Sequence, residues 1–225
     1  MTEYGIHYPS QLSGAQLDAF LAKGWYRMGQ GIFTTNYVIQ EDQFFRVFWL
    51  RYDLYKLTLG KTAQSIISRN QTFTCIIKPA FIDAEIEELY ALYKSALVFE
   101  PAASVRSWLL ENATESIYET WMVEVRHGDL LIAAGFFDLG DSGLAGILNC
   151  YHPSYKKYSP GKYLMLKKIA FARSQGMQWY YPGYIVKDYH RFDYKLFVDK
   201  NAAELFLPEG NAWHAYRDDL MTGAT

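Results

Sequence analysis

Three apolar runs in the second half of the chain, followed by a helix and a further strand, restrict the fold most. The runs cover residues 117–125, 130–138 and 144–151. Glycine and aspartate in the intervening turns, 127–129 and 140–143, are typical of antiparallel connections. Ser159-Pro160-Gly161 predicts a helix start, Gly176 ends that helix, and residues 178–181 resume as a strand. A strand, a crossing helix and a strand make a right-handed parallel connection, so we expect a mixed sheet.

The first half of the chain carries weaker signals for helices and for strands. Apolar spacing predicts helices over residues 11–23, 62–68 and 83–97, and a further helix from 104 to 110. Strands are expected within 25–54, around a turn at Gly29 and Gly31, and over 72–77. The sequence therefore predicts an α+β fold, with a mixed sheet flanked by helices and a smaller N-terminal α/β region.

Several classes of protein are excluded by composition. No stretch approaches the roughly 18 consecutive apolar residues of a membrane-spanning helix, and the first residues lack the basic and apolar segments of a secretion signal. We therefore expect a cytoplasmic protein without a membrane partner. The two cysteines, Cys75 and Cys150, are isolated, and the five histidines are scattered, so no zinc ribbon, disulfide framework or bound metal is expected.

Charge is segregated along the chain although the formal net charge is only −2. Residues 151–195 hold nine basic and two acidic residues, a local charge of +7, whereas the remainder carries 13 basic and 22 acidic residues, or −9. A basic segment in an acidic molecule suggests an anionic ligand. The tyrosines interleaved with these lysines favour a nucleotide, although they could equally be core residues.

The start of the predicted helix is the expected anion site. A helix start presents unpaired backbone N–H groups and the positive end of the helix dipole, and Gly161 lets an anion approach closely. Lys156, Lys157 and Lys162 add three ammonium groups. A meander, a glycine-containing turn and a helix are also the pattern of N-acetyltransferase-class acyltransferases, whose turn holds the coenzyme A pyrophosphate, but Tyr163 stands where that signature has a small residue.

Four blocks of the basic segment carry a resemblance to a known family. They are Tyr151-His152-Pro153, Ser159-Pro160-Gly161-Lys162-Tyr163, residues 180–188 (YYPGYIVKD) and Arg191-Phe192-Asp193-Tyr194-Lys195. In this order and spacing the sequence resembles the arginyl/leucyl-tRNA–protein transferase family, with weaker likeness at residues 24–27 and 68–70. The resemblance implies an N-acetyltransferase-like fold, an aminoacyl-tRNA donor, and an acceptor protein whose N-terminal residue is acidic. We divide the chain accordingly into the N-terminal region of the transferase, residues 1–80, and an N-acetyltransferase-like core, residues 81–225.

The sequence also departs from the family pattern. Residues 34–37 (TTNY) replace the cysteine cluster that family members carry after the Gly-Trp block. His152 replaces the aspartate of Tyr-Asp-Pro, and Pro182 replaces the leucine of Leu-Gly-Tyr. The protein is therefore expected to be a divergent relative, with the donor, the acceptor or the activity open to change.

Site residues follow from the charge pattern and from the matched blocks. The expected donor site comprises Lys156, Lys157, Ser159, Gly161, Lys162 and Tyr163. The residues expected to bind the acidic acceptor are Lys187, Arg191 and Lys195, assisted by Arg69. The residues expected near the chemistry are Tyr184, Asp188 and Asp138, the two aspartates as proton acceptors or water-orienting groups. No cofactor is expected, because aminoacyl-tRNA is itself the activated donor.

Two other functions remain open. A coenzyme A dependent N-acyltransferase of the same fold class would use the helix start equally well. A non-catalytic binder of acidic N-termini would keep the acceptor site alone. The sequence does not decide whether arginine or leucine is donated.

Overall fold

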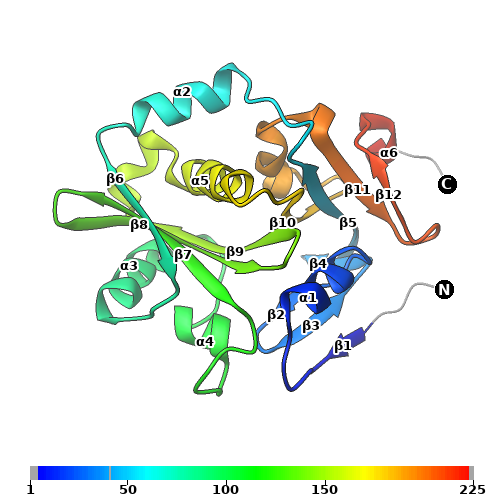
Figure 1. The fold of residues 1–225 in the computed structure, drawn as a ribbon, viewed down its shortest axis with the longest axis horizontal. Coiled ribbons are helices and arrows are strands. Elements are labelled where there is room, and N and C mark those ends of the chain that lie inside the picture. The colour runs from blue at the N-terminus through cyan, green and yellow to red at the C-terminus, as the bar shows by residue number, and fades with distance from the viewer. Residues whose placement is uncertain (1–4, 41, 223–225) are drawn as a thin grey trace.

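The computed structural model describes residues 5–40 and 42–222, and a nine-stranded mixed sheet forms its centre (Figure 1). The strands are β4 (Tyr37–Gln40), β5 (Gln43–Asp53), β6 (Thr74–Pro79), β7 (Thr120–His127), β8 (Leu130–Leu139), β9 (Gly143–Tyr151), β10 (Trp179–Val186), β11 (Ala203–Leu207) and β12 (Ala212–Ala215). Their order is β12-β11-β5-β10-β9-β8-β7-β6, and β4 pairs with β5. Because β5 and β6 precede residue 80, the sheet draws strands from both sides of the expected boundary.

The meander and the parallel connection are confirmed. Strands β7, β8 and β9 pair antiparallel in sequence, and β10 pairs parallel to β9 after the crossing helix α5 (Pro160–Ser174). Gly176 follows α5 with a φ of 70°, a left-handed conformation that glycine adopts without strain. Residues between β9 and α5 form a 3-10 helix, η1 (Pro153–Tyr158), and β10 continues beyond the predicted 178–181 to Val186.

A small second sheet holds the N-terminal segment. It comprises β1 (Gly5–His7), β3 (Gly31–Thr34) and β2 (Tyr26–Met28), with β3 in the middle. The adjoining helix α1 (Gly14–Leu21) is shorter than the predicted 11–23. It begins at Gly14 because the Ser13 side chain accepts a hydrogen bond from the Gln16 backbone N–H, which caps the first turn.

Helices cover both faces of the large sheet (Figure 1). On one face, α2 (Lys61–Arg69) and α5 pack against inward side chains such as Leu50 and Phe137. The opposite face is covered by α3 (Ala84–Ser95), α4 (Val105–Leu110) and the small sheet, which pack against Phe136 and Trp49. Neighbours in a strand point to opposite faces, so the two faces have separate cores. One buried cluster lies under α2 and α5, and two lie on the opposite face. The chain closes with η2 (His190–Phe197), η3 (Lys200–Ala202) and α6 (Asp218–Thr222).

Candidate functional site

Strands β9 and β10 separate in the middle of the large sheet, and we call this opening the fork. Their parallel pairing covers only Trp179–Tyr181 against Gly143–Ala145. Beyond it, β9 follows β8 and β10 follows β5. Residues 146–149 are consequently half-buried although β9 is an interior strand. The fork therefore leaves residues 146–149 of a central strand without a strand partner on the β10 side.

Irregularities in both strands accompany the fork. The β8–β9 register shifts between Phe136 and Phe137, and the β10–β5 register shifts between Tyr180 and Gly183, which has a φ of 97°. Such shifts bend the strand that carries the extra residue. At the first shift, the buried Lys168 ammonium of α5 lies 2.7 Å from the Phe136 carbonyl oxygen.

The Lys168 ammonium also donates to Asn149 Oδ1, 2.8 Å away, on the half-buried part of β9. A Cβ at Gly135 would approach Asn149 Oδ1 to 2.7 Å, so a glycine makes room for this pair. Burial lowers the pKa of Lys168 to about 7, although the carboxylate of Asp138 opposes the shift. Lys168 therefore ties α5 to the irregular segment of β9.

Tyr26, from the small sheet, stands at the base of the fork. Its hydroxyl oxygen lies 2.5 Å from the Gly146 carbonyl oxygen on β9 and 2.8 Å from the Tyr181 carbonyl oxygen on β10, and it can donate to either. The ring stacks on Trp49 of β5, with 5.2 Å between centroids. A side chain from outside the large sheet thus fixes the point where the two strands part.

The start of α5 lies beside the fork with the features of an anion site. Ser159 adopts a left-handed conformation, with a φ of 56°, and its side chain does not cap the helix. A Cβ on Gly161 would meet no atom closer than 3.7 Å, in the Tyr151 ring, so there is space above the first turn. The Lys156 side chain is exposed. The Lys157 and Lys162 ammonium groups lie over the rings of Tyr158 and Phe197, at 5.2 and 5.1 Å.

A hollow of about 560 Å³ opens beside Lys162, and two expected site residues, Lys162 and Asp188, line it. Lys162 of α5, Asp188 after β10 and Tyr194 of η2 share its wall, together with Phe197 and Lys200. Asp188 is exposed and adopts a φ of 58°. The structure therefore brings together a donor-site lysine and one of the expected proton acceptors.

Lys195 is buried beside the part of β10 that has left β9. Its ammonium donates to the Tyr184 carbonyl oxygen at 2.6 Å and lies 4.7 Å from the Phe192 ring centroid and 5.2 Å from that of Tyr184. Within the described residues no carboxylate lies within ion-pair distance of this ammonium. Burial lowers the pKa of Lys195 to about 7. A buried ammonium without a counter-charge is unusual and points to an anionic ligand.

Tyr184 lies on the part of β10 that has left β9, where its carbonyl oxygen accepts from Lys195. Its ring packs edge-on against Trp49 and is half-buried. Burial raises the pKa of its hydroxyl, which is therefore protonated at neutral pH and able to donate a hydrogen bond.

Other expected site residues lie elsewhere. Tyr163 is 3% exposed and packs in the core under α5 instead of facing the donor site. Arg191 stacks on Phe99, with 3.7 Å from the guanidinium carbon to the ring centroid. Arg69 donates to the Lys157 carbonyl oxygen at 3.2 Å, which puts it beside the donor lysines. Lys187 follows β10 at the edge of the same region.

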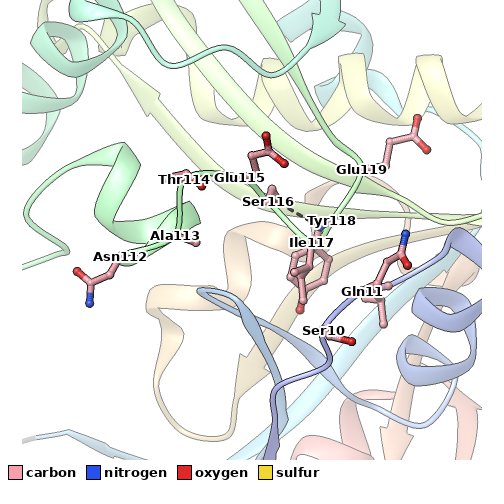
Figure 2. Close-up of a pocket in the computed structure, with 11 residues that line it drawn as sticks. Ser10, Gln11, Asn112, Ala113, Thr114, Glu115, Ser116, Ile117, Tyr118 and Glu119 are labelled. Carbon is pink, nitrogen blue, oxygen red and sulfur yellow. Dashed lines mark hydrogen bonds between the residues drawn. The ribbon is translucent and has the colours of Figure 1, made fainter.

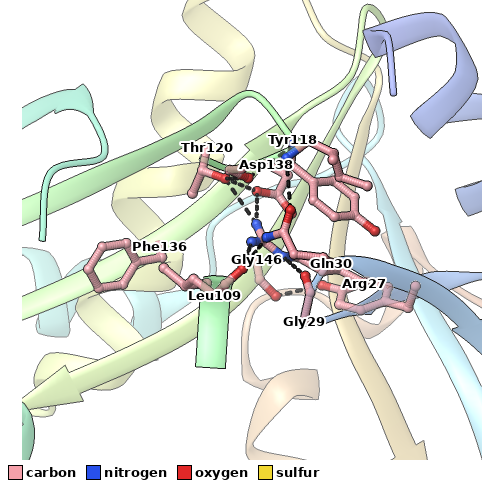
Figure 3. Close-up of polar contacts among 12 residues, drawn as sticks. Arg27, Gly29, Gln30, Leu109, Tyr118, Thr120, Phe136, Asp138 and Gly146 are labelled. Atoms are coloured by element: carbon pink, nitrogen blue, oxygen red, sulfur yellow. Dashed lines mark hydrogen bonds and ion pairs between the residues drawn. The ribbon is translucent and has the colours of Figure 1, made fainter. Parts of the chain in front are cut away.

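Asp138 of β8 forms a buried ion pair with Arg27 of β2 (Figure 3). Its Oδ1 atom accepts from Arg27 Nη1 and from the Thr120 hydroxyl, each at 2.7 Å. Arg27 also donates to the carbonyl oxygens of Gly29, at 2.8 Å, and Leu109. Burial raises the pKa of the Asp138 carboxyl, and Arg27 opposes that rise. The Asp138 side chain is 0% exposed. Its surroundings are therefore those of a structural ion pair, and a substrate cannot reach the carboxylate.

Three residues of this region were not singled out from the sequence. Tyr26 and Arg27 lie in the block of weaker family likeness, residues 24–27, which was the available signal. Lys168 gave none, because it lies among other lysines of a helix and was counted with them.

A second hollow, of about 820 Å³, lies between residues 10–12 and 112–119 (Figure 2). None of the expected site residues lines it. Among the described residues, no group of three or more His, Cys, Asp and Glu side chains could hold a metal ion. Likewise, none of the described helices has the length and apolar character needed to cross a membrane.

The fold and the fork define a class of protein. A meander, a helix that starts beside it, and a parallel strand that diverges from the meander make an N-acetyltransferase-like fold. A solved structure supports this: the C-terminal domain of a putative lysylphosphatidylglycerol synthetase from Agrobacterium fabrum matches with a TM-score of 0.50 and 14% identity, over 68% of this chain and 52% of that one.

Sequence comparison narrows the class to one family. The model described as "Arginine-tRNA-protein transferase, C terminus" matches residues 85–201, more than half of the chain, and the chain belongs to this family. It is 26% identical over 141 residues to an aspartate/glutamate leucyltransferase of Marinobacter nauticus, covering 60% of this chain and 58% of the relative. A protein of the same name from Hahella chejuensis is 29% identical over 133 residues, covering 56% and 55%. The matches thus span little more than half of these relatives.

Proposed function

We propose that the protein transfers an amino acid, arginine or leucine, from aminoacyl-tRNA to the N-terminal α-amine of proteins that begin with aspartate or glutamate. The family assignment supports the reaction class. The observation that carries the proposal is the fork: it opens β9 for an extended ligand beside a helix start suited to phosphate. A cytoplasmic location, where charged tRNA occurs, is part of the proposal.

The donor end of the proposal rests on the start of α5. The phosphates of the terminal adenosine would meet the N–H groups at Gly161 and the ammonium of Lys162, while Lys156 and Lys157 add positive charge nearby. The ester carbonyl would then point along β9 towards Tyr184. Tyr184 is protonated at neutral pH and would donate to the developing oxyanion.

The acceptor end rests on Lys195. An acidic side chain at the acceptor's first position would supply the carboxylate that this buried ammonium lacks. Lys187 and Arg191 precede Lys195 in the same segment and would add positive charge. Arg69 would support Lys157, whose carbonyl oxygen it contacts.

The reaction itself needs little from the protein. The α-amine nitrogen attacks the ester carbonyl carbon, the bond from that carbon to the ribose oxygen breaks, and an amide forms. The nitrogen loses one proton and the ribose oxygen gains one. We assign the first of these transfers to Asp188, directly or through water, since Asp138 is enclosed by its ion pair. No cofactor is required, because the ester is already activated and positioning supplies most of the acceleration.

One experiment tests this proposal directly. The protein is incubated with arginyl-tRNA or leucyl-tRNA and with a peptide that begins with Asp, and mass spectrometry follows the peptide's first residue. We expect a gain of one amino acid residue, and no gain on a matched peptide that begins with Ala. The variant Lys195→Met should raise the KM for the Asp peptide, whereas Lys23→Met, at an exposed turn position after α1, should not. Unmodified peptide with both charged tRNAs would refute the proposal.

A further inference from the structure

All 24 acidic residues lie outside two long segments of the chain. Residues 54–82 and 142–187 contain no Asp or Glu, yet they hold 11 of the 22 Lys and Arg residues. The two segments are separated by about 60 residues that include the acidic helix α3 and the first two strands of the meander. Their shared composition is therefore not a property of one local stretch.

The fold joins these segments on one face of the sheet. The first forms α2 and β6, and the second forms β9, η1, α5 and β10. Helices α2 and α5 lie side by side on the same face (Figure 1), and Ile66 of α2 belongs to the same core as Leu164 of α5. The buried Asn70 amide, after α2, donates to the Tyr158 carbonyl oxygen of η1 at 2.9 Å.

Four exposed cations of this face lack carboxylate partners among the described residues. Lys56 and Lys78 pair with Asp53 and Glu124, and Lys168 is buried. Lys61, Arg69, Lys156 and Lys157 are exposed. In the part of the chain that the structure describes, no carboxylate lies within ion-pair distance of any of the four. We call these four residues the α2–η1 surface.

We propose that the α2–η1 surface binds the phosphate backbone of RNA, namely the acceptor stem of the tRNA whose charged end enters the fork. The inference rests on the proposed function. It adds α2, which precedes the family match at residue 85, to the donor site. Clustered cations without internal partners release counterions on binding phosphates, which makes the association favourable and salt-dependent.

The side chains between these cations favour RNA over a membrane. The exposed face of α2 carries only Lys61, Thr62, Gln64, Ser65, Ser68 and Arg69. Hydroxyl and amide groups of this kind hydrogen-bond phosphate and ribose oxygens. A membrane-bound helix needs a free apolar face, but the apolar side of α2, with Ala63 and Ile66, is already buried in the core.

The α2–η1 surface is continuous with the start of α5, so a bound RNA would be oriented towards that helix start. Arg69 reaches from α2 to the Lys157 carbonyl oxygen, and η1 leads directly into the first turn of α5. A duplex resting on α2 would therefore deliver its single-stranded end to Gly161 and the fork. This arrangement explains why two acid-free segments meet where they do.

The test measures RNA binding by the full chain without any transfer. The probe is an uncharged acceptor-stem RNA hairpin, titrated between 50 and 200 mM salt, and vesicles of phosphatidylglycerol serve as the competing anionic surface. The variant Lys61→Gln/Arg69→Gln should weaken RNA binding roughly tenfold near 100 mM salt and reduce the slope of log K against log salt by about 2. The matched control, Lys23→Gln/Arg106→Gln, removes the same charge from exposed positions in the turn after α1 and on α4, and should change neither.

Each result decides the inference. Equal slopes for the α2 variant and the wild type would overturn it, as would wild-type binding to the vesicles but not to the hairpin. Weaker RNA binding by the α2 variant, with no amino acid transfer by the wild type, would support the surface and refute the proposed function alone. Transfer by the wild type with RNA binding unaffected in the variant would do the reverse.

Discussion

Breaking the ion pair between Arg27 and Asp138 should destabilise the protein strongly. The two side chains are 1% and 0% exposed, and 2.7 Å separates Arg27 Nη1 from Asp138 Oδ1. The substitution Arg27→Met would leave a buried carboxylate without its cation and would free the hydrogen-bonded carbonyl oxygens of Gly29 and Leu109. Removing one partner of a buried pair costs about 3–5 kcal/mol of unfolding free energy. For a chain of this length that corresponds to a melting temperature about 6–20 °C lower.

Urea denaturation followed by tryptophan fluorescence measures this loss. The control is Lys200→Met, which breaks the exposed pair with Asp218 (54% and 78% exposed) and should leave the unfolding free energy almost unchanged. The double variant Arg27→Met/Asp138→Leu should lose much less than the two single losses combined, because it leaves no uncompensated charge. A single variant as stable as the Lys200 control would refute the view that this pair is enclosed and that it fastens the small sheet to the meander.

Three further predictions concern the fork. Tyr26→Phe removes the hydroxyl that lies between the β9 and β10 carbonyl oxygens. It should lower the unfolding free energy, measured by urea denaturation, by about 1–3 kcal/mol and should also lower kcat. An unchanged unfolding free energy together with an unchanged kcat would contradict its role. Gly161→Ala should stabilise the helix by up to about 1 kcal/mol yet raise the KM for charged tRNA, because the new methyl group occupies the space above the first turn; an unchanged KM would argue against the donor site. Lys195 has a pKa of about 7 in the folded protein, against a usual value of 10.5. Between these pH values the unfolded chain binds more protons than the folded one. The unfolding free energy of the wild type should therefore rise from pH 7 to 9, with a Lys195 contribution of up to about 1.4 kcal/mol per pH unit. Lys195→Met should lose the part of this gain that Lys195 supplies and keep the part that the buried Lys168, with a pKa of about 7, supplies in both proteins. Parallel pH curves for the two proteins would show that the Lys195 ammonium is not desolvated.

The regular part of the second half could be predicted because its signals are local. The turns between the meander strands contain glycine and aspartate, and α5 begins at Pro160 and ends before Gly176 as its sequence indicates. These residues act within a few positions of themselves, so the pattern predicts them without knowledge of the tertiary structure.

The fork could not be predicted, since it depends on where two distant strands stop pairing. Gly146 and Pro182, which has no backbone N–H, directly follow the last pair, but they do not show which strands are paired there. The hydroxyl at that point comes from Tyr26, far away in the sequence. The expected role of Tyr163 came from its place in a motif. Residues 163–166 are all buried, so α5 has no single apolar stripe from which the core position of this ring could be read.

Charge was informative in a way that the net value concealed. Exposed positions tolerate either sign of charge with changes of about 0.5 kcal/mol, so fold stability does not require acid-free helices. The exposed positions Thr62, Gln64 and Ser65 in the N-terminal half of α2, where the helix dipole favours acidic side chains, have room for carboxylates and carry none. Solubility is no better served by lysine than by glutamate. The restriction of every carboxylate to the rest of the chain is therefore better explained by a polyanionic partner on this face than by folding, and the salt dependence of RNA binding measures that explanation directly.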